Sequence, residues 1–158
     1  MPGPVWVFDT SALIAIKSLP REKRPGVLAA LTTLVKEGRL RMPTQVVAEL
    51  ERYSDAVQEW AADVEAIACS GSPSLDDTKQ VLSIVPKVLD PKKDSGADEA
   101  DPYVLAMARQ IKARGDDARI VTQETKDNPD KMSLNTAAGI LGIASVPLLG
   151  FTHFEEIA

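Results

Sequence analysis

The stretch VWVFDTSALIAI, residues 5–16, decides the predicted fold. Its first four residues are apolar and do not alternate with polar ones, which is typical of a strand buried on both faces. Asp9 follows this strand directly, with Thr10 and Ser11 after it. A carboxylate beside a buried strand is unfavourable unless something compensates its charge. We therefore expect Asp9 either to cap the helix that follows or to hold something positive.

Outward from this strand, short apolar segments alternate with helical ones along the 158 residues. This alternation predicts an α/β fold, a three-layer α/β/α sandwich with a mostly parallel central sheet of four or five short strands. No repeat or composition break divides the chain, so we expect one domain over residues 1–158. The expected strands are 4–8, 39–42, 118–122 and 143–149. The expected helices are 11–17, 27–36, 44–69, 74–89, 102–113 and 134–141. The third of these helices is expected to break near residue 54, and the fourth to end or kink at Pro86.

Local signals place several helix ends. Thr44 follows Pro43 and is the expected N-cap of its helix. Gly38 and Gly142 are the expected stops of two others, because glycine commonly ends helices. Residues 127–133 are polar, and we expect them to form a loop before the last of these helices.

The composition is that of a soluble globular protein, with 44% apolar and 26% charged residues. No apolar run approaches the ~18 residues of a membrane span, and the N-terminus lacks the features of a signal peptide. Cys69 is the only cysteine, which excludes an internal disulfide and favours a reducing cytoplasm. His153 is the only histidine, which disfavours a Cys/His zinc site and a Ser-His-Asp triad. Any chemistry should therefore depend on carboxylates.

The net charge gives little information about nucleic-acid binding. A formal value of −5 argues only weakly against a non-specific nucleic-acid binder. Acids grouped in a metal pocket lower the net charge without repelling a substrate once the metal is bound. Basic residues occur in local groups, and a solvated mixed surface is the ordinary interpretation of each.

Acidic residues follow strands, or border the core-facing side of helices, in four segments. Asp9 and Glu124 come after the first and third expected strands. In an open α/β sheet, ligands collect at the C-terminal ends of the strands, where the helices begin. Glu49 borders the apolar face of its helix, while Asp98 and Asp101 share a face with core-directed residues. Each acid alone has an ordinary explanation as a helix cap, a solvated side chain or a turn residue.

Together, these acids come from four segments and are all expected at one edge of the sheet. Glu51 and Glu99, by contrast, do not share the core-facing sides of their helices. Gathered carboxylates repel one another and raise each other's pKa unless a cation neutralises them. An all-oxygen site without His or Cys suits Mg²⁺ or Mn²⁺. The pattern therefore predicts a divalent metal site at this edge.

A family resemblance is carried by FDTSALI at 8–14, VVAELER at 46–52, ADPYVLAMA at 100–108 and IVTQE at 120–124. In this order, the segments resemble the PIN-domain family of metal-dependent nucleases, which includes the VapC-like toxins of bacterial toxin–antitoxin pairs. The resemblance implies that Asp9, Glu49 and Asp101 are the three principal metal-binding acids, and that Asp98 matches an extra acid of some members. The fourth motif departs from the pattern, because Glu124 stands where the family usually has Asp or Asn.

The resemblance implies a metal-dependent endoribonuclease that hydrolyses RNA phosphodiesters with Mg²⁺ or Mn²⁺ as its cofactor. Asp9, Glu49 and Asp101 are then the primary metal-binding and catalytic acids, and Asp98 and Glu124 complete the shell. Implied partners are the RNA substrate, a second copy in a homodimer and, for toxin members, an antitoxin protein. Because no membrane segment is predicted, we expect the protein to act in the cytoplasm.

Other functions are compatible with the same pattern. One is a catalytically silent PIN-fold module that serves as a binding partner or scaffold. A phosphoryl-transfer enzyme of the haloacid dehalogenase type needs a second Asp where this chain has Ser11, and a response receiver needs adjacent acids before the first strand's Asp. A dinucleotide-binding domain needs G-x-G-x-x-G after the first strand, and no such motif follows it.

Overall fold

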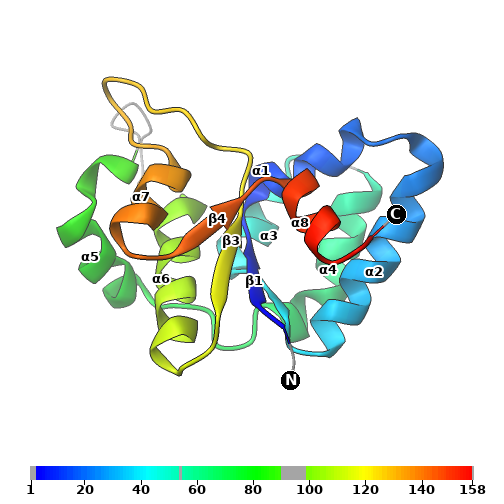
Figure 1. Cartoon of the computed structure of the whole chain (residues 1–158), viewed down its shortest axis with the longest axis horizontal. Helices are drawn as coiled ribbons and strands as arrows, with labels where there is room; N and C mark the ends of the chain where they lie inside the picture. The colour runs from blue at the N-terminus through cyan, green and yellow to red at the C-terminus, as the bar shows by residue number, and fades with distance from the viewer. Residues whose placement is uncertain (1–2, 54, 90–98, 158) are drawn as a thin grey trace.

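A four-stranded parallel sheet forms the centre of the computed structural model, which describes residues 3–53, 55–89 and 99–157. In these ranges the strand order is β2-β1-β3-β4, and every neighbouring pair is parallel. The order places β1 and β3 in the middle, side by side (Figure 1). The strands are β1 (Val5–Phe8), β2 (Leu40–Arg41), β3 (Ala118–Val121) and β4 (Ala144–Val146).

Helices cover both faces of this sheet, so the predicted three-layer α/β/α class is confirmed (Figure 1). The helices α5, α6 and α7 lie on one side, and α2, α4 and α8 lie on the other. The helix bounds are α1 (Thr10–Ile14), α2 (Arg24–Lys36), α3 (Thr44–Leu50), α4 (Ala56–Ala68), α5 (Leu75–Ile84), α6 (Ala100–Ala113), α7 (Leu134–Ile140) and α8 (Leu148–Phe154), with short 3₁₀ helices at η1 (Ala15–Ser18), η2 (Arg21–Lys23) and η3 (Pro86–Val88).

The strand β1 is buried on both faces, as its apolar run predicts. Trp6, Val7 and Phe8 have no exposed surface. Phe151 of α8 packs edge-on against the rings of Trp6 and Phe8, with centroid separations of 5.0 and 4.9 Å. Burying side chains of this size stabilises a fold by roughly 1.5–3 kcal/mol each. This packing holds the C-terminal end of β1 in a rigid setting, and Asp9 comes directly after it.

The fourth strand and the helix after it differ from expectation. A strand was expected over 143–149, but β4 ends at Val146 and Pro147 is the N-cap of α8. Proline lacks a backbone donor for a sheet ladder but fits the start of a helix, so the chain changes direction there. An apolar run of this length has no period that separates strand from helix. The helix α8 is then held by Leu148 and Phe151, which are buried.

Other helix ends agree with their local signals in part. Gly38 and Gly142 follow α2 and α7 with φ of 76° and 74°, the left-handed conformation that glycine supplies at helix ends. Thr44 is not an N-cap, because Pro43 takes that position in an extended conformation and Thr44 is the first helical residue. The expected helix 44–69 is two helices, and Asp55 caps the second by accepting a hydrogen bond from the Gln58 amide at 2.9 Å.

Two further sequence predictions concern the core and the membrane. Cys69 is buried and free, and burial raises the pKa of its thiol to about 12, so it behaves as a small core residue. Across the described ranges, the structure contains no helix with both the length and the apolar character that a membrane crossing requires.

Candidate metal centre

The C-terminal ends of β1 and β3 bring two parts of the chain into contact. The strand register pairs Phe8 with Val121, so Asp9 and Thr122 are neighbours just beyond the paired residues. The Asp9 amide donates to the Val121 carbonyl at 3.0 Å. The Thr122 hydroxyl donates to Asp9 Oδ2 at 2.9 Å. The sheet therefore determines where the Asp9 carboxylate lies.

The structure does not support helix capping, one of the two expected roles of Asp9. Asp9 occupies the N-cap position of α1, but its side chain makes no capping hydrogen bond to Thr10–Ile14. Instead, Oδ2 accepts hydrogen bonds from the hydroxyls of Ser11, at 2.7 Å, and Thr122. Only 2% of Asp9 is exposed. A buried carboxylate that does not cap its helix favours the other explanation, compensation by a cation.

Three carboxylates meet at this edge of the sheet. One oxygen from each of Asp9, Asp101 and Glu124 lies within 4.8 Å of the others. Asp101 is in the first turn of α6, which packs against β1 and β3. Glu124 follows β3, and its amide donates to the Thr122 hydroxyl at 3.0 Å. Asp9 thus forms one acidic group with two residues that lie more than 90 positions further along the sequence, as the strand-end argument predicted.

Glu49 reaches the same neighbourhood but lies outside this group. Its Oε1 accepts a hydrogen bond from the Thr10 hydroxyl at 2.5 Å. Thr10 follows Asp9 directly in the sequence, so this hydrogen bond holds Glu49 beside the three carboxylates. Glu49 also lines an open groove of about 570 Å³, together with Arg52 and Tyr103. The structure therefore favours Glu49 as an outer partner of the acidic group.

The remaining sequence predictions have mixed outcomes. Asp98 lies outside the described residues. Glu51 is exposed, as expected. Glu99 was expected to point away from the core, but it is the N-cap residue of α6 and only 5% exposed. Helical spacing does not apply to a residue with extended backbone before the first turn, and this explains the error. His153 is exposed on α8.

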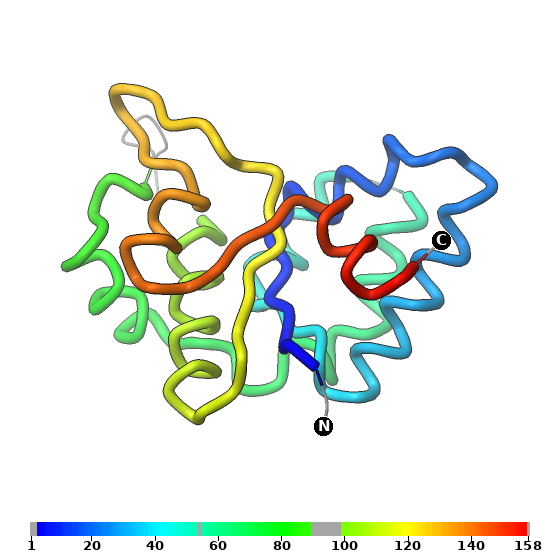
Figure 2. The backbone as a smooth tube through the Cα atoms, in the orientation of Figure 1, coloured from blue at the N-terminus to red at the C-terminus, as the bar shows by residue number. Residues whose placement is uncertain are grey.

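Lys131 is the residue at this site that the sequence analysis missed. Its Nζ donates to Asp101 Oδ2 at 2.8 Å and to Glu124 Oε1 at 2.5 Å. Lys131 belongs to the segment between β3 and α7, which extends away from the sheet edge and returns (Figure 2). Only the expected polar loop over 127–133 marked this segment. The sequence NPDK contains turn-forming residues, but nothing in it indicates where the turn packs.

The acidic group changes the proton affinity of its members. Burial, followed by repulsion from Asp101, raises the pKa of Asp9 to about 7, although hydrogen bonds from Ser11 and Thr122 oppose the rise. Burial and repulsion from Asp101 also raise the pKa of Glu124. Burial lowers the pKa of Lys131, but attraction to Asp101 and Glu124 outweighs it and raises that pKa overall. The group therefore carries more negative charge than its protein partners stabilise.

The model of the family described as Domain of unknown function (DUF4411) matches residues 6–155. The chain belongs to this family. The match begins within β1 and ends at residue 155, so it includes Asp9, Asp101 and Glu124. No curated protein matches the sequence. The family's description names no activity.

The donor set of this DUF4411 member fits a hard divalent cation. Carboxylate oxygens from Asp9, Asp101 and Glu124 are the ligand type that Mg²⁺ and Mn²⁺ prefer. The Ser11 and Thr122 hydroxyls both donate to Asp9 Oδ2, which leaves Oδ1 for a further ligand. These hydroxyls also fix the orientation of the carboxylate, as outer partners do in metal sites. The arrangement is suited to holding a cation at the end of the sheet.

Proposed function

We propose that this protein is a metal-dependent endoribonuclease that hydrolyses RNA phosphodiesters with Mg²⁺ or Mn²⁺. The observation that carries the proposal is the convergence of Asp9, Asp101 and Glu124 around a buried carboxylate that does not cap its helix. Nuclease chemistry and the RNA substrate come from the resemblance of the four sequence segments to PIN-domain nucleases.

In this proposal the chain's own residues bind and orient the reacting groups. Asp9, Asp101 and Glu124 hold the cation, with Glu49 acting from outside through Thr10. A bound divalent ion supplies Lewis acidity, which lowers the pKa of a water and stabilises charge on the phosphate. Ser11 and Thr122 keep the Asp9 carboxylate in a fixed orientation. Within the acidic group, metal binding replaces the general base that a histidine would otherwise provide.

The biological setting of the proposal also comes from the resemblance. A VapC-like toxin acts on RNA in the cytoplasm, is held inactive by an antitoxin protein and forms a homodimer. We propose the same partners for this chain. The test of the antitoxin is co-purification with the product of a neighbouring reading frame, and the test of the dimer is light scattering of the purified protein.

The enzymatic proposal is tested by incubating purified protein with fluorescently labelled single-stranded RNA. Cleavage is expected with Mn²⁺ or Mg²⁺ and is expected to stop in EDTA. Asp9→Asn should lower the rate by about 1,000-fold or more, because even outer partners of metal ligands commonly contribute ~10–100-fold. Asp63→Asn, at an exposed position on α4, is the matched control and should cleave normally.

Two outcomes would contradict the proposal. Cleavage that continues in EDTA, or that survives Asp9→Asn, would mean that the acidic group is not the catalytic centre. Mn²⁺ binding is measured separately by calorimetry. A wild-type protein that binds no Mn²⁺ would favour the alternative function, a catalytically silent module with this fold.

A further inference from the structure

An ammonium group lies inside the acidic group, in contact with two of its three members. Lys131 Nζ is 2.8 Å from Asp101 Oδ2 and 2.5 Å from Glu124 Oε1. The Lys131 side chain is 17% exposed, so this contact is largely shielded from water. An ion pair on the surface contributes little to stability because water and salt screen it. A pair shielded from water is screened less, so its ammonium interacts more strongly with nearby charged groups.

The backbone around Lys131 is held by several hydrogen bonds. Asn128 Oδ1 accepts from the amides of Asp130, at 2.9 Å, and Lys131, at 2.8 Å. The Asn128 amide donates to the Lys131 carbonyl at 3.0 Å, so the turn closes on itself. The next amide, that of Met132, donates to the Lys87 carbonyl at 2.7 Å. The turn and its anchor to η3 therefore determine the direction from which Lys131 enters the site.

We propose that Lys131 is a built-in cation that takes the place of a second metal ion, so that this centre holds one divalent ion beside an ammonium. The inference rests on the proposed metal-dependent function and specifies the composition of that same site. Lys131 bridges Asp101 and Glu124 as a bridging cation would, and the contacts that hold Asp9 are hydroxyls and not this ammonium.

Charge balance supports a single ion. The three carboxylates and the ammonium carry a formal charge of −2, which one divalent cation neutralises. A second divalent ion would have to share Asp101 and Glu124 with a cation that the loop already holds there. Repulsion between like charges a few ångströms apart in a shielded site disfavours that arrangement. In this position Lys131 is a positioning residue, because it acts through the two carboxylates it contacts.

The test counts Mn²⁺ ions per chain by calorimetry and by electron paramagnetic resonance of free Mn²⁺. Wild-type protein is expected to bind one ion. Lys131→Met removes the ammonium but keeps an unbranched side chain, and it is expected to bind two. Lys131→Arg keeps the positive charge and should return the count to one. Lys126→Met is the matched control, because Lys126 is an exposed lysine of the same loop, and it should also bind one.

The outcomes separate this inference from the proposed function. Two ions bound by wild-type protein, or one ion bound by folded Lys131→Met, would overturn the role of Lys131 and leave a metal-dependent nuclease in place. No Mn²⁺ bound by wild-type protein would overturn the proposed function, and the inference with it. If circular dichroism shows that Lys131→Met does not fold, Lys131→Gln provides a second neutral variant. The number of Mn²⁺ ions bound by wild-type protein tests the inference independently of either variant.

Discussion

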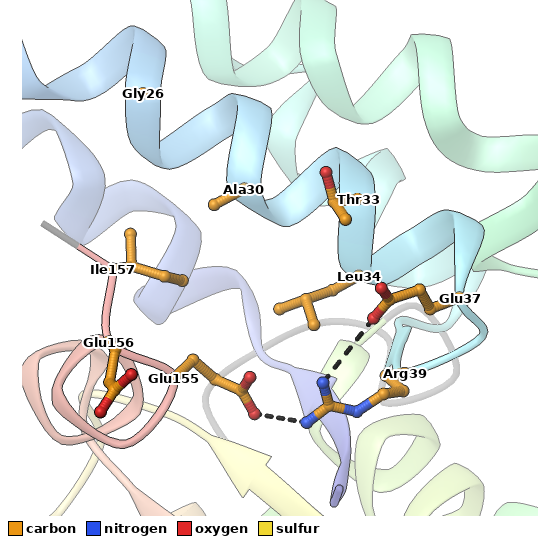
Figure 3. Close-up of a pocket in the computed structure, with 9 residues that line it drawn as sticks. All are labelled: Gly26, Ala30, Thr33, Leu34, Glu37, Arg39, Glu155, Glu156 and Ile157. Atoms are coloured by element: carbon orange, nitrogen blue, oxygen red, sulfur yellow. Dashed lines mark hydrogen bonds and ion pairs between the residues drawn. The ribbon is translucent and has the colours of Figure 1, made fainter. Parts of the chain in front are cut away.

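The two ends of the sheet compensate buried and partly buried carboxylates in opposite ways. At the N-terminal end, Glu155 Oε2 accepts a hydrogen bond from Arg39 Nη2 at 2.5 Å (Figure 3). It also accepts one from Trp6 Nε1 at 2.8 Å. At the C-terminal end, the ammonium of Lys131 pairs with Asp101 and Glu124. Asp9, the third carboxylate there, accepts hydrogen bonds only from hydroxyls among the described residues. In the first arrangement, protein groups alone compensate the charge of the Glu155 carboxylate. The second keeps an excess of negative charge, which is why we assign function to that end.

The surroundings of the two carboxylate sites differ in the same sense. The cavity beside Glu155 has a volume of about 550 Å³ and lies between α2 and the C-terminal segment (Figure 3). Glu155 faces Arg39 there, and the exposed Glu37 lies 3.7 Å from the same guanidinium. The most buried carboxylate of this cavity therefore has a cation beside it, and the excess negative charge lies on Glu37 and Glu156, which are exposed to water. Cavity volume does not distinguish the two ends of the sheet, whereas the burial of the carboxylate that has no cation beside it does.

The largest expected effect is on the pH dependence of stability in metal-free protein. The pKa of Asp9 rises from 3.8 to about 7 on folding, which corresponds to about 4 kcal/mol at about 1.36 kcal/mol per unit. Between these values the native state binds more protons than the unfolded state, so the free energy of unfolding falls as pH rises. Asp9→Asn cannot ionise, and its stability relative to wild type should therefore increase from pH 4 to pH 7.

This prediction is measured by urea unfolding of both proteins in EDTA across that pH range. Asp55, Asp77 and Asp127 have lowered pKa values and act in the opposite direction, but they are common to both proteins and cancel in the difference. Adding Mn²⁺ should stabilise wild type at pH 8 and leave Asp9→Asn nearly unchanged. If the difference in the free energy of unfolding between the two proteins does not vary with pH, the Asp9 carboxylate is not uncompensated, and the two ends of the sheet do not differ in this respect.

A smaller effect is expected at the opposite end. Arg39→Met leaves the Glu155 carboxylate, 12% exposed, with the Trp6 indole but without its cation. The pair is partly buried, so the expected loss lies between about 1 kcal/mol for a surface pair and about 3 kcal/mol for a buried one. Urea unfolding should show this loss, while RNA cleavage per folded molecule should not change. Arg114→Met is the control, because its partner Asp116 is on the surface and such pairs contribute at most about 1 kcal/mol.

This result would also sharpen the comparison. If Arg39→Met is as stable as wild type, the Glu155 carboxylate does not need a cation to compensate its charge. A variant that stays folded but loses cleavage would show that the two ends are not independent. Either result would contradict the assignment of structure to one end and chemistry to the other.

The smallest effect is expected from Glu49→Gln. The amide oxygen can still accept the Thr10 hydrogen bond, so the fold should be unaffected. Because the structure makes Glu49 an outer partner, the affinity for Mn²⁺ should fall by only about 10-fold. Calorimetry compares it with Glu51→Gln, an exposed glutamate just beyond the end of the same helix. A loss as large as that of Asp9→Asn would make Glu49 a direct ligand, as the family resemblance implies.

Local patterns in the sequence predicted most of the fold and part of the site. The parallel sheet, its four strands and the order of helices followed from apolar periodicity. Asp9 and Glu124 could be placed near each other because the ends of neighbouring parallel strands meet at one edge. The helix α8 was not predicted, because Pro147 interrupts an apolar run that has no clear period and that was expected to be strand as far as residue 149. Glu99 was misplaced because helical spacing fails before the first turn.

By itself, the sequence determined which residue types could act, since one histidine and one cysteine leave carboxylates as the chemical groups. It also determined the sheet edge at which Asp9 and Glu124 meet, because strand ends are a local property of the chain. Only the tertiary structure decided that Lys131 enters the acidic group and that Glu49 stays outside it. Those outcomes depend on how a loop and a helix pack against distant elements, and packing is not encoded in the spacing of residues along one segment.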